Sequence, residues 1–418
     1  MARELSLTKI PKGWSYGLLD DYAERCSGHT PSKSFPEYWN GGIKWISLAD
    51  TFRLDKGLVK ETDKEISSLG IDNSSAQIHP AGTVVISRDA GIGKSGVMAE
   101  PMAVSQHFIA WKCDFNLKAH NWFLYNWLQL NKPEFERQAV GSTIKTIGLP
   151  YFKKLKIALP PYEEQRKIAK ILSTWDKAIA KTEKLIETSK QQKKALMQQL
   201  LTGKKRLVNP ETGKVFEEEW EETLISSIAK CFSGGTPSRK KDEYYGGSIP
   251  WITSGKLNDR FVCSVNEYIT EVGVKNSSAK YVKEGSLLIA MYGATAGKVA
   301  INYLVGATIN QAILALHVRE EHSNTFLFYL LEREMEKAIN LVQGGQPNLN
   351  ASIIKGLKVN IPAFEEQQKI AAVLTAADKE IETLETKLAH FKQEKKALMQ
   401  QLLTGKRRVK VDRVEGVS

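Results

Sequence analysis

The chain has 418 residues, of which 42% are hydrophobic and 25% charged, a balance that excludes a disordered protein and predicts two to four folded domains. Its 59 Lys and Arg residues against 47 Asp and Glu residues give a formal net charge of +12, which favours a polyanionic partner without identifying one. No run of about 18 apolar residues and no signal-peptide stretch occurs, which argues against a membrane protein and predicts a cytoplasmic one.

The first predicted domain spans residues 1–157. Aromatic and β-branched stretches alternate in it with glycine-rich turns and predict strands of a mixed sheet; they are IKWISLAD (43–50), GTVVIS (82–87) and HFIAW (107–111). A helix is predicted over 121–138. The cysteines of the whole chain stand singly, without zinc-ligand spacing, and predict buried or idle thiols; they are Cys26, Cys113, Cys231 and Cys263.

A long helix is predicted within residues 158–205. Its seam residues step by four and three positions from 168 to 200, which is the spacing of a coiled-coil heptad. Pro161 and the acidic pair Glu163 and Glu164 stand where a helix begins, and Gly203 stands where a helix ends. A helix of about 40 residues is about 60 Å long at a rise of 1.5 Å per residue.

The second half of the chain repeats the first. KALMQQLLTGK occupies 194–204 and recurs at 396–406, an offset of 202 residues. Two further pairs of segments face each other: LPPYEEQRKIAKIL (159–172) with IPAFEEQQKIAAVL (361–374), and GHTPS (28–32) with GGTPS (234–238). The repeat predicts a second domain over 206–359, a second long helix within 360–407 and a tail over 408–418. Strands are predicted at IPWITSGK (249–256), GSLLIA (285–290) and QAILALHV (311–318), with a helix over 324–340.

Each long helix carries a narrow apolar stripe, which a single helix cannot bury by itself. The natural partner of each is its own repeat, and this predicts an antiparallel coiled coil that relates two α/β (α+β) domains by a pseudo-twofold. The alternative is that each helix packs on its own domain or on other copies of the chain. Polar seam residues predict a register-setting or partner-binding surface; they are Thr182, Ser189, Lys193 and Lys395.

Two stretches imitate catalytic motifs. DAGIGKSG (89–96) ends like a phosphate-binding loop but has Arg88 where the motif needs glycine, and its repeat has Val299 where the motif needs a hydroxyl. LPPY (159–162) resembles the Asn/Asp-Pro-Pro-Tyr element of adenine methyltransferases but begins with Leu159, which accepts no hydrogen bond. The seven histidines share no repeated partner, so no catalytic or metal-binding residues are predicted and the chain is expected not to be an enzyme.

Taken from about residue 10 to 405, the chain resembles the specificity subunit of a type I restriction-modification enzyme. The domain–helix–domain–helix order, the two EEQ junctions, the KKALMQQLLTGK helix ends and the TPS and GK elements carry this resemblance. It implies two target-recognition domains that each read one half of a split, asymmetric site in double-stranded DNA. It also implies that the helices set the spacer and dock two modification (methyltransferase) subunits, and that restriction/translocase subunits join them. S-adenosylmethionine, ATP and Mg are expected on the partner subunits, with no cofactor in this chain.

Side chains suited to phosphate and base contacts lie on the glycine-rich loops. The candidates for DNA contact are Thr30, Ser32, Lys33, Arg88, Lys94, Thr143 and Lys145 in the first domain, and Thr236, Ser238, Arg239, Tyr292, Lys298, Gln346 and Asn348 in the second. For each, a solvated loop residue is the open alternative. The aromatic residues Tyr38, Trp39, Tyr244 and Tyr245 favour packing over stacking on DNA.

Two rival functions make different demands on the sequence. A coiled-coil adaptor that binds DNA without reading its sequence predicts sequence-blind binding with a steep salt dependence. A nuclease needs clustered acidic residues for metal, and none repeats between the two halves.

Overall fold

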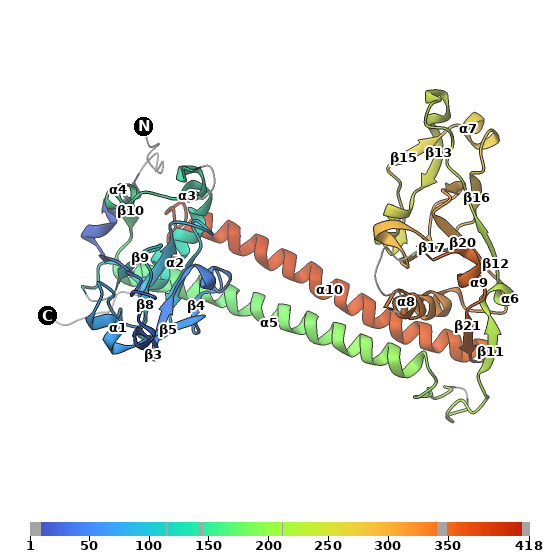
Figure 1. The fold of residues 1–418 in the computed structure, drawn as a ribbon, viewed down its shortest axis with the longest axis horizontal. Coiled ribbons are helices and arrows are strands. Elements are labelled where there is room, and N and C mark those ends of the chain that lie inside the picture. The colour runs from blue at the N-terminus through green and yellow to red at the C-terminus, as the bar shows by residue number, and fades with distance from the viewer. Residues whose placement is uncertain (1–9, 114–115, 142–144, 211, 341–348, 412–418) are drawn as a thin grey trace. The chain divides into compact units, whose positions relative to one another are not determined.

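The computed structural model describes residues 10–113, 116–141, 145–210, 212–340 and 349–411 (Figure 1). The chain divides into two compact units, one formed by Met1–Glu183 with Thr386–Ser418 and the other by Lys184–Glu385. Each unit therefore holds one globular domain and one half of each long helix. No helix in the described ranges is long and apolar enough to cross a membrane.

The first unit begins with the strands and helices of the first domain. Its strands are β1 (Ser15–Leu18), β2 (Glu24–Ser27), β3 (Trp39–Ile46), β4 (Leu58–Val59), β5 (Lys64–Ile66), β6 (Val84–Ser87), β7 (Ser95–Met98), β8 (Ala103–Val104), β9 (Phe108–Lys112) and β10 (Lys156–Leu159). Its helices are α1 (Ser68–Asp72), α2 (Asn121–Leu130), α3 (Lys132–Gln138) and α4 (Leu149–Lys153), and the long helix α5 (Tyr162–Leu200) follows.

The second domain repeats this order. Its strands are β11 (Glu221–Leu224), β12 (Ala229–Ser233), β13 (Tyr245–Ile252), β14 (Phe261–Val262), β15 (Glu267–Ile269), β16 (Lys280–Val282), β17 (Leu287–Ala290), β18 (Val299–Asn302), β19 (Ala307–Ile309), β20 (Ile313–Val318) and β21 (Lys358–Ile361). Its helices are α6 (Ile225–Ile228), α7 (Glu271–Lys275), α8 (Asn324–Asn340) and α9 (Ala351–Lys355), and the long helix α10 (Phe364–Leu402) follows.

Each domain contains a five-stranded sheet, a smaller sheet of three or four strands, and a two-stranded sheet, β1-β10 or β11-β21. The five-stranded order is β2-β9-β6-β7-β4 in the first domain and β12-β20-β17-β18-β14 in the second, so the two domains share one topology. Parallel and antiparallel pairs occur in both sheets, as a mixed sheet requires. The expectation of one sheet was nevertheless wrong, because β3 pairs with β5 and β8 in a separate sheet. Side chains such as Ile46, Val85 and Phe108 form an apolar core shared by the two sheets.

The helix predicted over 121–138 is broken, whereas its repeat over 324–340 is the continuous helix α8. Pro133 lies in the first turn of α3, where its missing N–H costs little. A proline in the interior of a continuous helix removes a hydrogen bond and clashes with the preceding turn. Helix α2 therefore ends at Leu130 and α3 begins at Lys132. Pro133, the one proline within 121–138, indicated this break in the sequence.

The ends of the long helices match their predicted signals. Both helices have 39 residues and carry two glutamates in the first turn. Gly203 and Gly405 follow the last helical leucines with φ of 69°, the left-handed conformation that glycine adopts without steric cost. The N–H of Lys205 donates to the carbonyl of Gln199 at 3.2 Å, and Arg407 repeats this bond with Gln401 at 3.0 Å. These bonds satisfy carbonyls that a helix end leaves open.

The heptad seam is confirmed. All ten predicted seam residues of α5 are buried or half-buried, and so are the ten that lie 202 positions later in α10. The two helices lie side by side (Figure 1). Within the first unit Trp175 packs edge-on against Phe391 at 5.6 Å. Asp176 pairs with Lys395 at 2.5 Å and Glu183 with Lys392 at 2.7 Å, so the partner's number in α10 falls as the residue number in α5 rises. The helices therefore pack antiparallel.

Polar residues set the register of this seam. Lys193 forms an ion pair with Asp378 at 2.6 Å in the second unit, and Lys395 forms the matching pair with Asp176 at 2.5 Å in the first. Asp378 also accepts a hydrogen bond from the Tyr329 hydroxyl at 2.7 Å, so its carboxylate is held on two sides. A shift of one residue along the seam separates each lysine from its carboxylate. The register-setting role predicted for the two seam lysines is thus visible in their contacts.

The repeated EEQ motif has a structural role in both units. The carboxylate of Glu164 is 3% exposed and accepts two hydrogen bonds from Arg408 at 2.8 and 2.7 Å. Glu366, 1% exposed, accepts the same two bonds from Arg206, which follows the other long helix. Buried charges are stable only when paired in this way. In each unit the first turn of one long helix is therefore joined to the segment that follows the other.

The apolar core of the first domain includes residues from both long helices. Ile168 and Leu172 enter it from the start of α5, and Met399, Leu402 and Leu403 enter it from the end of α10. The second core repeats this arrangement with the end of α5 and the start of α10. Packing of each helix on its own domain, which was the alternative to helix pairing, thus occurs together with pairing.

His79 is an exception to the expectation of ordinary histidines. Its side chain is fully buried, and neither ring nitrogen has a hydrogen-bond partner within the described residues. Burial, followed by the nearby Lys112, lowers the pKa of His79 to about 4 from 6.5. The β-bridge between His79 and Met102 corresponds to the pairing of Val282 with Ala307 between β16 and β19. The second domain therefore has Val282 where the first has His79. The imidazole therefore stays neutral in an apolar position.

We expect the first unit to lose stability as the pH falls from about 6.5 to about 4. In this range the unfolded chain takes up a proton at His79 and the folded chain does not. The difference of about 2.5 pKa units lowers the free energy of unfolding by about 3 kcal/mol. His79→Val, which installs the residue of the second domain, removes this loss and the two unpaired nitrogens. Hydrogen exchange of the β6 and β9 amides in both variants measures it. If the difference in the free energy of opening between wild type and His79→Val stays constant from pH 7 to 4, the assignment is contradicted.

Candidate nucleic-acid interface

The predicted contact residues of the first domain gather at one end of its five-stranded sheet. The strand register places the end of β2, the end of β6 and the starts of β7 and β9 at the same end of the sheet. Thr30, Ser32 and Lys33 follow β2, and Arg88 and Lys94 lie in the turn that joins β6 to β7. Residues separated by more than 50 positions in the sequence are thus brought together by strand pairing.

The TPS loops are pinned to the smaller sheet by close backbone contacts. A Cβ at Gly28 would lie 1.8 Å from the carbonyl oxygen of Val104, and one at Gly234 would lie 1.8 Å from that of Ile309. The N–H of His29 donates to the Val104 carbonyl at 3.0 Å, so the loop and β8 are held together. Only glycine fits where two backbones approach this closely.

Aromatic side chains fix the outer part of these loops. The indole N–H of Trp39 donates to the Ser32 carbonyl at 3.2 Å, and the Tyr245 hydroxyl donates to the Pro237 carbonyl at 2.5 Å. Trp39 also packs edge-on against Trp45 at 5.2 Å. The packing role predicted for these aromatic residues agrees with the contacts.

Two glutamines that the sequence reading did not single out hold the loop threonines. The Thr30 hydroxyl donates to the side-chain oxygen of Gln106, and the Thr236 hydroxyl donates to that of Gln311. The signal was present, because SQHF and NQAI align in the repeat. A glutamine held through its oxygen keeps its amide N–H groups for another acceptor.

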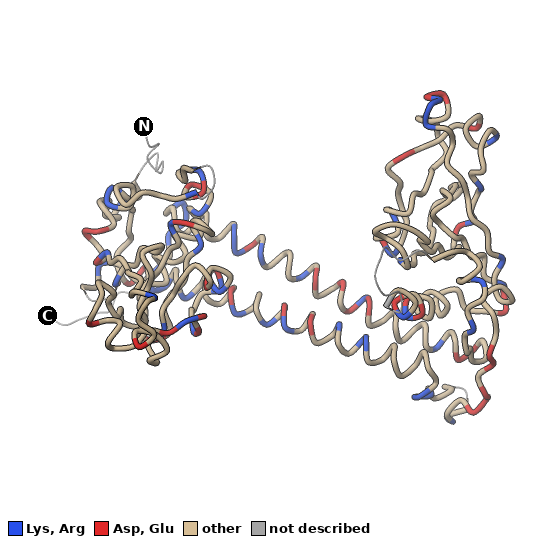
Figure 2. Tube along the Cα trace, viewed as in Figure 1, with Lys and Arg blue, Asp and Glu red and all other residues tan. Residues whose placement is uncertain are grey.

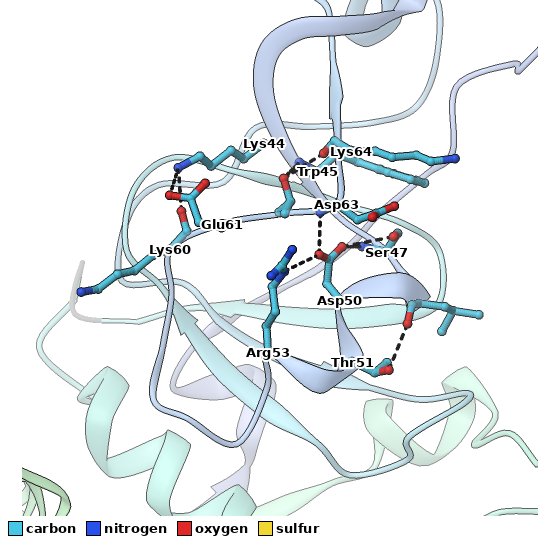
Figure 3. Close-up of polar contacts among 12 residues, drawn as sticks. Lys44, Trp45, Ser47, Asp50, Thr51, Arg53, Lys60, Glu61, Asp63 and Lys64 are labelled. Atoms are coloured by element: carbon cyan, nitrogen blue, oxygen red, sulfur yellow. Dashed lines mark hydrogen bonds and ion pairs between the residues drawn. The ribbon is translucent and has the colours of Figure 1, made fainter. Parts of the chain in front are cut away.

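Thr30 and Lys33 line a pocket of about 290 Å³ together with Ser105, Gln106 and His107. Its floor is organised by Asp50, which is fully buried and lies at the centre of the hydrogen bonds in Figure 3. Asp50 accepts bonds from the Ser47 N–H at 2.9 Å, the Arg53 guanidinium at 3.1 Å and the Asp63 N–H at 2.7 Å. The charged residues that line the pocket are Lys33, Lys64 and Asp63.

Not every lysine beside this pocket is available to a ligand. Lys44 donates to the Lys60 carbonyl at 2.6 Å and pairs with Glu61 at 3.4 Å (Figure 3). It also pairs with Glu100 at 2.5 Å. The hydrogen bond to Glu100 raises the pKa of Lys44. Lys33, in contrast, is exposed, and no carboxylate pairs with it in the described part of the chain.

A second pocket of about 550 Å³ lies next to the first and is lined by Lys94, Lys132 and Lys145 among others. Asp89 lies between the two pockets: it lines the second and contacts His107, which lines the first. Asp89 also accepts a hydrogen bond from Thr146. Four described candidates of the first domain therefore line two neighbouring pockets, Thr30 and Lys33 the first and Lys94 and Lys145 the second, whereas Ser32 and Arg88 line neither. His107 and Asp89 are further residues that the sequence did not single out.

The GKSG stretch is a strand-to-strand turn. It joins the antiparallel strands β6 and β7, and its Gly93 N–H donates to the Ser87 carbonyl at 3.0 Å. A phosphate-binding loop instead opens onto a helix whose N–H groups cradle the phosphates. Arg88 donates to the Ile147 carbonyl at 3.1 Å and Lys94 to the Thr51 carbonyl at 3.3 Å, so both cations are partly used inside the domain.

The second domain presents a related surface with different side chains. Arg239 pairs with Glu267 at 2.7 Å and lies over the rings of Tyr245 and Trp251 at 4.5 and 5.1 Å. The pairing with Glu267 raises its pKa. Tyr292 is 40% exposed, and Lys298 is exposed in the following turn.

A further segment returns to each loop. The Leu349 N–H donates to the Met291 carbonyl at 3.0 Å, as the Ile147 N–H donates to the Arg88 carbonyl at 2.8 Å in the first domain. The candidates Thr143, Gln346 and Asn348 lie outside the described residues.

No disulfide joins the four cysteines, and no group of three or more His, Cys, Asp or Glu residues that could hold a metal occurs in the ranges that the structure covers. The surfaces described above therefore offer hydrogen-bond donors, acceptors and cations. Such groups suit the edges of bases and the oxygens of phosphates.

The sequence matches the family described as type I restriction modification DNA specificity domain twice, over residues 11–190 and 217–393. It is similar to the type I restriction enzyme MjaIX specificity subunit of Methanocaldococcus jannaschii, with 24% identity over 426 positions that cover 97% of this chain and 96% of the relative. The EcoR124I/EcoR124II specificity subunit of Escherichia coli is 27% identical over 282 positions, covering 64% of this chain and 65% of that protein.

Solved structures give the same grouping. The S subunit of a type I restriction-modification system from M. genitalium superposes with a TM-score of 0.57 at 15% identity, covering 96% of this chain and 99% of that one. A chain from a study of complex assembly and conformational transition in the type I R-M system gives 0.62 at 18% identity, covering 96% and 100%. At these identities the likeness shows the fold.

Proposed function

Because the chain belongs to the family of type I restriction-modification DNA specificity domains, we propose that it recognises the DNA sequence for a type I complex, each domain reading one half of an asymmetric bipartite site. One observation carries this proposal: a single scaffold presents different side chains at matching loop positions. Lys33 corresponds to Arg239 and, by matching backbone hydrogen bonds, Arg88 to Met291, whereas Thr30 and Thr236 are held by equivalent glutamines. Two surfaces of equal construction and unequal chemistry suit two different half-sites.

Identical exposed residues on the two long helices support docking of the same partner twice. Met197, Leu200 and Leu201 repeat as Met399, Leu402 and Leu403 because both sets serve a domain core. Other identical positions of the motif are exposed and have no such reason; they are Lys194, Gln198 and Gln199 with Lys396, Gln400 and Gln401. Basic and acidic residues also interleave along both helices (Figure 2). We assign these exposed positions to the contact with two modification subunits. In this proposal, S-adenosylmethionine bound to those subunits supplies the methyl group. Restriction/translocase subunits that depend on ATP and Mg complete the complex.

Selection from a random duplex library tests the proposal. The full chain with its modification subunits is expected to enrich two short, different motifs at a fixed separation. The rival adaptor function predicts binding with no enriched motif and with the same salt dependence for every duplex. Enrichment of one contiguous motif also contradicts the proposal.

Lys33→Ala is expected to weaken DNA binding several-fold for all sequences, because Lys33 is an exposed, unpaired cation beside the first pocket. Loss of one phosphate contact should flatten the slope of log Kobs against log salt concentration by about one. Lys154→Ala, an exposed lysine after α4, is the matched control and should leave both quantities unchanged. A sequence preference altered by Lys33→Ala at constant slope assigns Lys33 to a base and contradicts a phosphate contact.

Lengthening both helices is expected to move the half-sites apart. Seven residues that continue the heptad seam, inserted between Glu183 and Lys184 and again between Glu385 and Thr386, keep every core contact within its unit. They add about 10 Å, the rise of about three base pairs, and the bases of each half-site should stay the same. Activity should fall, because three base pairs also turn the DNA by about 100°. Retained activity at the original spacing contradicts a spacer role.

A further inference from the structure

A pocket of about 440 Å³ in the second domain is lined by three lysines, Lys230, Lys280 and Lys283, with His317 and Ser286 beside them. We call it the lysine pocket. Its size lies within the range of small-molecule binding sites. No carboxylate within the described residues pairs with any of the three lysines. The pocket therefore concentrates positive charge that the protein itself leaves unneutralised.

The corresponding place in the first domain is neutralised. Lys230 faces His317 across β12 and β20, and the same register in the first domain brings Glu24 opposite Lys112. Glu24 and Lys112 form an ion pair at 2.9 Å. Basic groups directly opposite each other in a sheet destabilise it, and an opposite-charge pair stabilises it. The second domain thus replaces an ion pair by two basic side chains, which an anionic ligand would stabilise.

Hydrogen-bond donors stand beside this charge. The Ser286 side chain is 2% exposed, and its hydroxyl oxygen lies 3.5 Å from Nδ1 of His317, the outer limit of a hydrogen bond. A buried hydroxyl normally has a closer partner. A phosphate oxygen in the pocket would accept from both groups, and ionised acceptors make the stronger hydrogen bonds.

Aromatic side chains form the remaining walls. Phe232 is half-buried, and Tyr281 is 49% exposed. Burial, followed by the nearby Glu271 carboxylate, raises the pKa of Tyr281. Both rings line the pocket, and an aromatic ring stacks well on a planar ligand.

The lysine pocket lies away from the candidate DNA-contact loops. Ser233 and Ala290 stand at the loop end of the sheet, opposite Leu314 and Ile313 respectively. Ser286, Lys230 and His317 stand at the other end, and the four steps along the strand from Ile313 to His317 span about 14 Å. A duplex held by the loops does not need this pocket.

We propose that the lysine pocket binds a phosphate ester that carries a planar ring, the chemistry of a nucleotide. The lysines neutralise the phosphate, the Ser286 hydroxyl and a ring N–H of His317 donate to its oxygens, and the ring lies between Phe232 and Tyr281. The site belongs to the second domain alone and is separate from the reading of DNA.

Calorimetric titration of the full chain at low ionic strength tests this with adenosine 5′-monophosphate, ribose 5-phosphate and adenosine. The monophosphate should bind saturably and more tightly than either fragment. Lys230→Glu, which installs the first domain's residue, should weaken that binding at least about tenfold, as expected for losing a charge-assisted contact. Lys280→Gln should weaken it as well, and Lys214→Glu, at an exposed lysine in the turn before β11, should not.

Several outcomes overturn the proposal. They are the absence of saturable binding, ribose 5-phosphate or adenosine binding as tightly as the nucleotide, and unchanged nucleotide affinity in both Lys230→Glu and Lys280→Gln. Duplex DNA separates the sources of phosphate: its affinity should be the same in wild type and Lys280→Gln. An equal loss of nucleotide and duplex affinity assigns the pocket to the DNA path and overturns a separate site. The Lys280→Gln variant keeps the test decisive if Lys230→Glu fails to fold.

Discussion

A fragment that ends at Arg206 is expected to dimerise and, with modification subunits, to direct methylation to a palindromic split site built from the first half-site. The fragment lacks the end of α10, which supplies Met399, Leu402 and Leu403 to the core of the first unit. A second copy can supply these groups, because the same residues recur 202 positions earlier as Met197, Leu200 and Leu201. Two identical readers then generate a true twofold axis.

The polar contacts can be replaced in the same way. Asp176 loses Lys395 but can pair with Lys193 of a second copy, and Glu164 loses Arg408 but can pair with Arg206. The aromatic contact cannot, because Ser189 stands where Phe391 packs on Trp175. Aromatic pairs contribute about 1 kcal/mol beyond their burial, so the dimer should form but be weaker than the intact arrangement.

Light scattering at tens of micromolar protein measures the dimer, and mapping of methylated adenines measures the site. Leu200→Asp should abolish dimerisation, since it places a charge in the seam and core. Leu185→Asp is the matched control: Leu185 is 45% exposed and lies off the seam. A fragment that stays monomeric with its modification subunits, or that directs methylation to a non-palindromic site, contradicts the repeat architecture.

Local patterns predicted the long helices well. Heptad spacing, the acidic first turn and the terminal glycine are properties of neighbouring residues, and they placed α5 and α10 nearly to the residue. Pairing between distant strands carries no such local signature, which is why β3 was assigned to the wrong sheet. Glu164 and Arg408 are 244 positions apart, and their ion pair follows from the antiparallel packing rather than from either sequence motif.

The candidate surface was predicted in part. Glycine-rich loops with hydroxyl and basic side chains pointed to Thr30, Lys33 and Lys94, and strand register brings these residues to one edge. Sequence could not distinguish an available cation from a paired one: Lys33 is exposed, whereas Arg239 is held by Glu267. Gln106 and Gln311 could have been found by asking which polar residues repeat beside the TPS loops.

Replacing the first domain is expected to change one half of the recognised site and leave the other half intact. The exchanged segment should run from residue 10 to 160 of the chain, so that β1 and β10, which pair with each other, are replaced together. The α5 and α10 helices and the second domain remain as they are. Separate contact surfaces act almost independently when they share no partner residues. The first half-site should therefore follow the donor protein completely.

Mapping of methylated adenines in DNA from cells that express the exchanged chain with its modification subunits tests whether each domain reads one half-site. We expect a hybrid site: one half of the donor's sequence, the unchanged second half of this protein's site, and the original spacing between them. A site in which both halves change, or in which neither half changes while methylation persists, contradicts the assignment of one half-site to each domain.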